Sequence, residues 1–469
     1  MRKILSIFII GIFFLLPLQP QTVDASASVD QVRTFVEQTY VGKLNGSLSS
    51  AQTIDELMNM LDVYSDYYSY DEYTALTNSI EQKTYGLGIQ YEYKKGLGIY
   101  IVTVYEDSSA YSVGLRAGDV IIEVNGSSVI SIDESTIPKL LLGAEGTYVT
   151  LAIKTTDGTI VNKTVQRKGF TVPIVTGKLL YGNTGYISVS SFAFNTALDV
   201  KSKAMQLVNQ GATSFILDFQ NNGGGYVQTA RQFISMFPNT VYAYLEITKS
   251  LSKIISPVYV NYKLPGTSRV LINRNSASAS EMLAASLKDQ KAAILYGERS
   301  YGKGIIQSFY SVFEDGSIRP DIYSGTDILK LTTNEFRGPS GTVIHDVGVT
   351  PNVVTATPIE DAHLDAIKDT YATYQSVKEF KDVPADKIFT IQFNKRIEAN
   401  IPSETIELVS LGGETIKTAI TIEDQSITVQ PKQPLVLGEK YVILIHPSIK
   451  GSNGKALKTG YYASISVKK

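Results

Sequence analysis

The sequence predicts a multidomain α+β protein, because the spacing of its apolar residues changes three times along the chain. Apolar positions follow a helical period in residues 28–82 and alternate in short, glycine-broken strands in residues 83–168. Strands and helices then alternate in residues 169–375, and short strands return in residues 383–469. A chain of 469 residues suits about three domains, and its 43% hydrophobic content can fill their cores.

Composition excludes several classes of protein. The net charge of −2 gives no sign of a nucleic-acid partner. Without any cysteine the chain can form no disulfide and no thiolate metal site. No His-Glu zinc motif is present, and Gly223-Gly224-Gly225 is not followed by the Gly-Lys-Ser/Thr of a nucleotide loop. We therefore expect neither a metal nor a cofactor.

Residues 1–27 have the pattern of a cleavable signal peptide. Arg2 and Lys3 precede an apolar run, and Ala25-Ser26-Ala27 matches an A-x-A cleavage site. Pro17 and the polar residues after it leave the apolar run shorter than the ~20 residues of a spanning helix. The mature protein is therefore predicted to be secreted or held in the cell envelope. Its first segment, residues 28–82, is expected to be helical.

One strand-to-helix turn has a pattern that suits catalysis. Arg269–Ile272 is typical of a buried strand, and the Met, Leu and Ala residues after Glu281 are typical of a helix. A serine in the turn between them, at 276, 278 or 280, would lie beside free backbone N–H groups and the positive end of the helix dipole. Ser278-Ala279-Ser280-Glu281 also reads as a plain capping box, which needs no chemistry.

A lysine between two glycines offers a base for such a serine. Lys303 precedes a strand-like run, and Gln307 would share its face if both lay on that strand. The three histidines, His345, His363 and His446, lie in no Ser-His-Asp pattern, and His345 is interpreted as structural. A lysine can accept the proton instead when burial lowers its pKa.

These segments resemble the C-terminal processing peptidases, which are tail-specific serine proteases with a crotonase-like α/β core. Ser276–Glu281 and Gly302–Gln307 match in sequence and spacing, and shorter matches follow at Leu329–Thr333, Pro339–Gly341 and Gly348–Pro351. The resemblance implies that Ser278 is the nucleophile, Lys303 the base and Gln307 its support. It places the oxyanion-hole N–H groups at Ala279 and at either Gly223 or Gly224. On composition alone Ser276 and Ser280 remain rival nucleophiles.

The second region resembles a PDZ domain. Ala110–Gly126 matches the most characteristic PDZ segment. The resemblance assigns peptide carboxylate binding to a loop made of Tyr85, Gly86, Leu87 and Gly88, where glycines let successive N–H groups face one anion. The peptide would then add as a strand to the sheet edge, and this domain could gate the protease.

The last region resembles the bacterial immunoglobulin-like domains of surface proteins, at Leu435–Tyr441 and Gly451–Leu457. It suggests association with the cell wall, while a closing helix at Pro358–Tyr374 could join the N-terminal helices in a homodimer. Together these features predict an exported serine endopeptidase that acts on protein C-terminal tails. The alternative from another class is a catalytically silent scaffold or adhesin that binds peptide C-termini.

Overall fold

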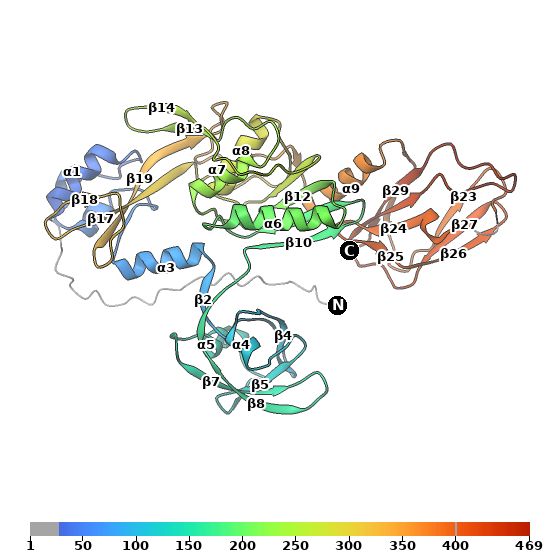
Figure 1. The fold of residues 1–469 in the computed structure, drawn as a ribbon, viewed down its shortest axis with the longest axis horizontal. Coiled ribbons are helices and arrows are strands. Elements are labelled where there is room, and N and C mark those ends of the chain that lie inside the picture. The colour runs from blue at the N-terminus through green and yellow to red at the C-terminus, as the bar shows by residue number, and fades with distance from the viewer. Residues whose placement is uncertain (1–27, 399–400) are drawn as a thin grey trace. The chain divides into compact units, whose positions relative to one another are not determined.

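The computed structural model describes residues 28–398 and 401–469, which form two compact units (Figure 1). The first unit combines residues 28–73 with 307–333, and the second combines 74–306 with 334–469. The predicted signal peptide lies outside the described residues. Within them, no helix has the length and apolar character needed to cross a membrane.

The first unit packs short helices against a small sheet. Its elements are α1 (Val29–Thr39), a 3-10 turn (Leu48–Ser50), α2 (Ile54–Met58), β1 (Asp66–Tyr68), β18 (Ile318–Arg319), most of β17 (Ile305–Val312) and the first part of β19 (Asp327–Arg337). Val32, Val36 and Leu57 from the helices pack on Leu329 and Leu331 of β19. The helix α3 (Tyr70–Ile80) links this unit to the second.

The predicted PDZ region forms a six-stranded sheet, a two-stranded sheet of β2 and β9, and two short helices. Its elements are β2 (Lys83–Gly86), β3 (Ile89–Lys94), β4 (Gly98–Val104), α4 (Ser109–Ser112), β5 (Val120–Val124), β6 (Ser127–Ser128), α5 (Ile137–Leu141), β7 (Tyr148–Lys154), β8 (Ile160–Gln166) and β9 (Lys168–Thr171). The sheet order is β3-β4-β5-β7-β8, so β3 is an edge strand. Buried Arg167 donates to the carbonyls of Leu140 and Leu141 and holds the end of α5.

A six-stranded sheet organises the catalytic region. Its strands are β10 (Val175–Leu180), β11 (Thr184–Val189), β12 (Ser214–Asp218), β15 (Ser268–Ile272), β16 (Ile294–Gly297) and β20 (Val353–Val354), in that order. Only the β10–β11 pair is antiparallel. The hairpin of β13 (Tyr244–Ile247) and β14 (Ser252–Ile255) pairs instead with the end of β19.

Helices cover both faces of this sheet (Figure 1). One face packs on α6 (Thr196–Asn209), α7 (Val227–Ser235) and α8 (Ala279–Asp289), and the other on α9 (Pro358–Thr370). Successive residues of β15 point to opposite faces of the sheet. Val270 packs in the core under α6, α7 and α8, and Leu271 packs in the core under α9. The predicted closing helix ends at Thr370 rather than Tyr374. Tyr371 and Tyr374 follow the end of the helix, and the centroids of their rings lie 4.8 Å apart with the planes tilted by 37°.

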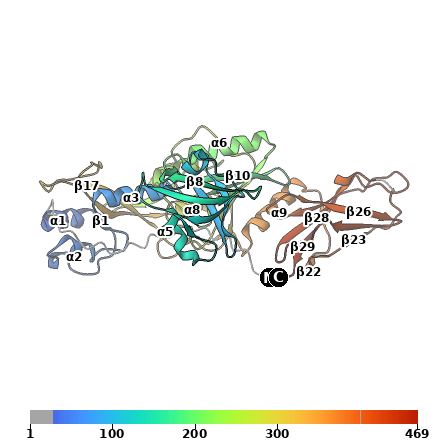
Figure 2. The ribbon, with the colours of Figure 1, turned by 90° about the horizontal axis from the view of Figure 1, so that it is seen from below.

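The C-terminal region has two sheets (Figure 2). One joins β21 (Gln375–Ser376), β22 (Phe380–Val383), β24 (Ile406–Ser410), β25 (Thr415–Ile416), β28 (Lys440–Ile445) and β29 (Tyr461–Val467). The other has the order β23 (Phe389–Gln392), β27 (Ser426–Pro431) and β26 (Thr418–Glu423). Side chains between the sheets form one core that includes Phe389, Val429, Ile443 and Ile465. The strands expected here from the sequence are present.

This region is joined to α9 by more than the connecting chain. Ile367 of α9 shares a buried cluster with Val409 and Val442 of the C-terminal sheet. Fully buried His363 bridges the two parts, with Nε2 2.9 Å from the carbonyl of Tyr181 while Nδ1 accepts from the N–H of Gly412 at 2.8 Å. The C-terminal domain is thus packed on the catalytic region.

Candidate active site

Ser278 lies in a strained turn between β15 and α8. The buried strand ends at Ile272, and the chain reaches the helix at Ala279 after a six-residue turn that closes with Ser278 as its last residue. Ser278 has φ 55° and ψ −113°, a backbone conformation that residues other than glycine rarely adopt. Such strain is typical of functional positions. The residue is half-buried, so its hydroxyl is open to a reactant.

The two neighbouring serines are placed differently. Ser276 and Ser280 are both buried, and both hydroxyls donate to backbone carbonyls. Ser276 bonds Phe219 at 2.8 Å, and Ser280 bonds Asn222 at 2.9 Å. Both therefore hold the turn against the neighbouring loop, which leaves Ser278 as the accessible hydroxyl of the three.

Lys303 lies just before β17 and not on it, because the strand begins at Ile305. The shared strand face, which required both Lys303 and Gln307 to lie on that strand, therefore does not apply to this pair. The main chains of the two glycines beside Lys303 are hydrogen-bonded to other segments. Gly302 O accepts from Asp346 N at 2.9 Å, and Gly304 O accepts from Phe336 N at 2.8 Å. A Cβ on Gly304 would lie 2.4 Å from His345 N. Close backbone approach thus explains why glycine is needed beside the lysine.

Glu281 connects the two predicted catalytic residues. Its side chain is fully buried, and Oε2 accepts from the N–H groups of both Ser278 and Lys303, at 2.9 and 2.8 Å. Oε1 accepts from Gly302 N and from Ser300 Oγ, each at 2.6 Å. One carboxylate thereby fixes the serine and lysine main chains beside each other.

The sequence indicated only half of this role. The Ser-x-x-Glu pattern predicted the bond from Ser278 N to Glu281, which is present. It could not indicate the bond to Lys303, because that contact joins segments 22 residues apart. No separate sequence signal marked Glu281.

The glycine loop after β12 lies against the turn that holds Ser278. A Cβ on Gly224 would lie 2.9 Å from Ser278 Cβ and 3.1 Å from Ala279 N. The N–H of Gly224 already donates to the side chain of Asn222 at 2.9 Å. Gly223 is exposed. Apart from the two adjacent residues, no heavy atom lies within 4 Å of the position that a Cβ on Gly223 would take. Of the two candidates, Gly223 has the accessible position.

Gln307 belongs to the first unit. There its Nε2 donates to Thr332 Oγ1 at 3.0 Å. The two residues pair across the neighbouring strands β17 and β19 of the small sheet. Its action on Lys303 stays a prediction.

The histidines are not hydrogen-bonded to Ser278. His363 and His446 lie at the junction of α9 with the C-terminal domain, where His446 Nε2 is 2.9 Å from Glu407 Oε2. His345 packs its backbone against Gly304, and its Nε2 is 3.9 Å from Asp346. Among the described residues, no group of three or more acidic, histidine or cysteine side chains could hold a metal ion.

The predicted carboxylate loop is shorter than expected. Tyr85 and Gly86 belong to β2, which pairs with β9, so only Leu87 and Gly88 form the turn into β3. Pairing with Lys168 and Gly169 draws the first two residues into a strand. Gly88 has φ +78°, and a Cβ there would lie 2.0 Å from Ser108 Cβ. The turn lies at the start of the edge strand β3, where an added strand could pair.

Comparison with known proteins identifies three domains. Residues 183–355 match peptidase family S41, residues 100–155 match the PDZ domain, and residues 365–466 match a bacterial Ig-like domain. The chain is 28% identical over 386 residues to a probable CtpA-like serine protease of Staphylococcus epidermidis, covering 81% of this chain and 75% of that protein. It is 29% identical over 323 residues to the carboxy-terminal processing protease CtpA of Bacillus subtilis, covering 68% and 66%.

Two solved structures are also similar. The photosystem II D1 C-terminal processing protease has 25% identity and a TM-score of 0.45, covering 72% of this chain and 95% of that one. A putative S41 protease of Bacteroides fragilis has 16% identity and a TM-score of 0.48, covering 71% and 91%.

Proposed function

Because this chain carries a peptidase family S41 domain together with PDZ and Ig-like domains, we propose that it is a serine endopeptidase that cuts proteins near their C-terminal tails. The names of its relatives, a serine protease and a carboxy-terminal processing protease, support this assignment. We further propose that the protein is exported with loss of residues 1–27.

One contact carries the proposal for the catalytic pair. The buried carboxylate of Glu281 binds the N–H groups of Ser278 and Lys303 through a single oxygen atom. A plain helix cap would need only the first of these bonds. The bond from Lys303 N to Glu281 is explained if the lysine must be held beside the serine.

In the proposed reaction, Ser278 Oγ attacks the scissile carbonyl and Lys303 Nζ accepts its proton. The N–H groups of Gly223 and Ala279 stabilise the resulting oxyanion, and one such donor contributes about 3–4 kcal/mol in serine proteases. Lys303 then protonates the leaving amine, and water hydrolyses the acyl-enzyme. Gln307 is assigned the support of Lys303.

Tail recognition is assigned to the PDZ domain. The N–H groups of Leu87 and Gly88 face the terminal carboxylate, and the peptide pairs with the edge strand β3. Blocking the carboxylate as an amide should then slow cleavage of a protein with an apolar tail, and removal of residues 84–168 should abolish the difference between free and blocked tails. Equal rates for both tails in the intact enzyme would refute recognition by this domain.

Labelling with a fluorophosphonate tests the nucleophile. The probe should modify Ser278 and leave Ser276 and Ser280 unmodified, as peptide mass spectrometry can show. Labelling should fall strongly in Lys303→Ala, because the serine would lose its base. A label on Ser276 or Ser280 would move the nucleophile, and an unlabelled chain that also cuts no protein would favour the silent scaffold.

A further inference from the structure

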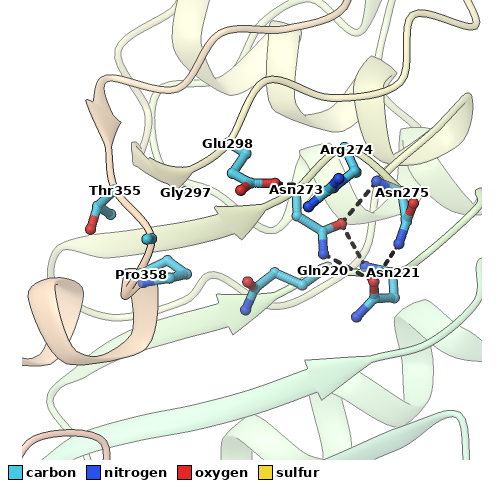
Figure 3. Close-up of a pocket in the computed structure, with 10 residues that line it drawn as sticks. Gln220, Asn221, Asn273, Arg274, Asn275, Gly297, Glu298, Thr355 and Pro358 are labelled. Carbon is cyan, nitrogen blue, oxygen red and sulfur yellow. Dashed lines mark hydrogen bonds and ion pairs between the residues drawn. The ribbon is translucent and has the colours of Figure 1, made fainter. Parts of the chain in front are cut away.

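A pocket lies at the carboxyl ends of the parallel strands, where open α/β sheets commonly bind ligands (Figure 3). We call it the amide pocket. Its volume is about 500 Å3, which falls among pockets that hold small ligands. It is lined by residues at and after the ends of β12, β15 and β16 and by those at the start of α9: Gln220, Asn221, Asn273, Arg274, Asn275, Gly297, Glu298, Thr355, Ala356 and Pro358.

The lining selects a polar ligand. No aromatic side chain and no aliphatic side chain larger than Ala356 or Pro358 lines the pocket. A ring could not stack there, and an apolar tail would find no matching surface. The lining instead offers four carboxamides and one side chain of each charge.

The carboxamides are held in place before a ligand arrives. Asn221 Oδ1 accepts from Asn273 Nδ2 at 3.0 Å and from Asn275 Nδ2 at 2.8 Å. Asn273 Oδ1 accepts from the main-chain N–H groups of Asn221 and Asn275, at 2.9 and 3.1 Å. These bonds occupy the side-chain oxygens of Asn221 and Asn273. Figure 3 shows this network on one side of the pocket.

The charged pair lies on the same pocket. Arg274 Nε is 3.5 Å from Glu298 Oε2, and their side chains are 79% and 47% exposed. Such an exposed pair contributes little to stability, so both groups can turn to a ligand at low cost. Arg274 suits a carboxylate and Glu298 suits an ammonium group.

We propose that the amide pocket binds short peptides with free ends, the class of product that tail cleavage would release. A free carboxylate fits Arg274 and a free amino group fits Glu298 once the two side chains have turned apart, and main-chain amides fit the neighbouring carboxamides. The loops that line the pocket continue to the proposed catalytic groups within three residues, from Asn275 to Ser278 and from Asn221 to Gly223. The choice of a peptide rests on the proposed function.

Calorimetric titration of the full-length Ser278→Ala protein with Ala-Ala-Ala tests this proposal. Saturable binding is expected, and N-acetylation or C-amidation should each weaken it by about tenfold or more, the loss expected for one charge-assisted hydrogen bond. Free alanine should bind more weakly than the tripeptide. Adding R274A and E298Q together should abolish binding, whereas the matched exposed pair R396A and D424N should leave it unchanged.

Four results would overturn the proposal: no saturation, equal binding in the R274A/E298Q protein, equal binding of free alanine, or unchanged affinity after N-acetylation. If the peptide bound through its carboxylate alone, the PDZ turn would be the binding site instead. N-acetylation would then leave the affinity unchanged. None of these readouts needs proteolysis. A protein that binds the tripeptide through Arg274 and Glu298 but cuts no substrate would refute only the proposed function.

Discussion

Glu281 shows how much one buried carboxylate can determine in this protein. It joins four groups from two segments, and two of these groups are the main-chain N–H groups of the proposed nucleophile and base. The geometry of the site therefore depends on a residue that is proposed to touch no substrate. We describe it as a positioning residue.

Replacing Glu281 with Gln should impair both stability and catalysis. The new NH2 group would face N–H donors, and each buried donor left without an acceptor costs about 1–3 kcal/mol. We expect a lower melting temperature and a fall in kcat that exceeds any rise in KM. Calorimetry and steady-state kinetics measure these effects, with the exposed Glu379→Gln as the matched control. Unchanged kcat in a folded Glu281→Gln protein would contradict the positioning role.

The two oxyanion-loop glycines should respond differently to alanine. Gly224 has φ +108° and no room for a Cβ, whereas Gly223 has open space. Gly224→Ala should destabilise the protein by about 1–3 kcal/mol, and Gly223→Ala by less than about 0.5 kcal/mol. Thermal unfolding of both variants tests this difference. Equal melting temperatures would show that the Gly224 backbone can relax.

At the scale of elements, the sequence predicted strands and helices well and their contacts poorly. The apolar run Arg269–Ile272 predicted β15 to within one residue, since such a run is a local signal. The strand-like run predicted after Lys303 is β17, which begins at Ile305, but the pattern gave no sign of the segments that bind Gly302 and Gly304. It also treated Tyr85 and Gly86 as loop, although pairing with β9 draws them into β2. Long-range partners are not encoded in local periodicity.

The junction of α9 with the C-terminal domain should weaken in acid. Burial lowers the pKa of His363 from its ordinary 6.5 to about 4. The unfolded chain therefore takes up a proton as the pH falls below 6.5, while the folded chain resists until about 4. This group contributes its full stabilisation above pH 6.5 and loses it between 6.5 and 4, a change of about 3 kcal/mol in order of magnitude.

Calorimetric unfolding of the wild type and His363→Gln at pH 7 and pH 4.5 checks this expectation. The variant should lose less stability on acidification, because glutamine does not titrate. Replacing His345 with Gln serves as the control for the loss of an imidazole elsewhere in the chain. Equal acid sensitivity of wild type and His363→Gln would contradict the assignment.

At the scale of the whole molecule, the C-terminal domain behaves as part of the catalytic region. The sequence suggested a separate module, because strand spacing reveals a sandwich but not the surface on which it packs. The structure buries Leu411 and Leu444 with Ile367 of α9 and pairs Lys440 with Asp361 at 2.7 Å. Any wall binding by this domain would thus bring the protease with it.

Ending the chain at residue 374 should therefore destabilise the remaining protease. Apolar side chains of α9 would meet water, at a cost of about 1.5–3 kcal/mol for each large one. Calorimetry of the shortened and complete chains measures the shift in melting temperature. A shortened protein with the original melting temperature would show that the junction adds no stability.

The central claim is that Ser278 and Lys303 form the catalytic pair. The most direct measurement is cleavage of an unfolded protein with a free apolar C-terminus by the wild type, Ser278→Ala and Lys303→Ala. The wild type should cut, and each variant should lose at least about a thousandfold in rate. The exposed Ser340→Ala and Lys253→Ala controls should cut like the wild type. Wild-type rates in Ser278→Ala or Lys303→Ala would contradict the claim.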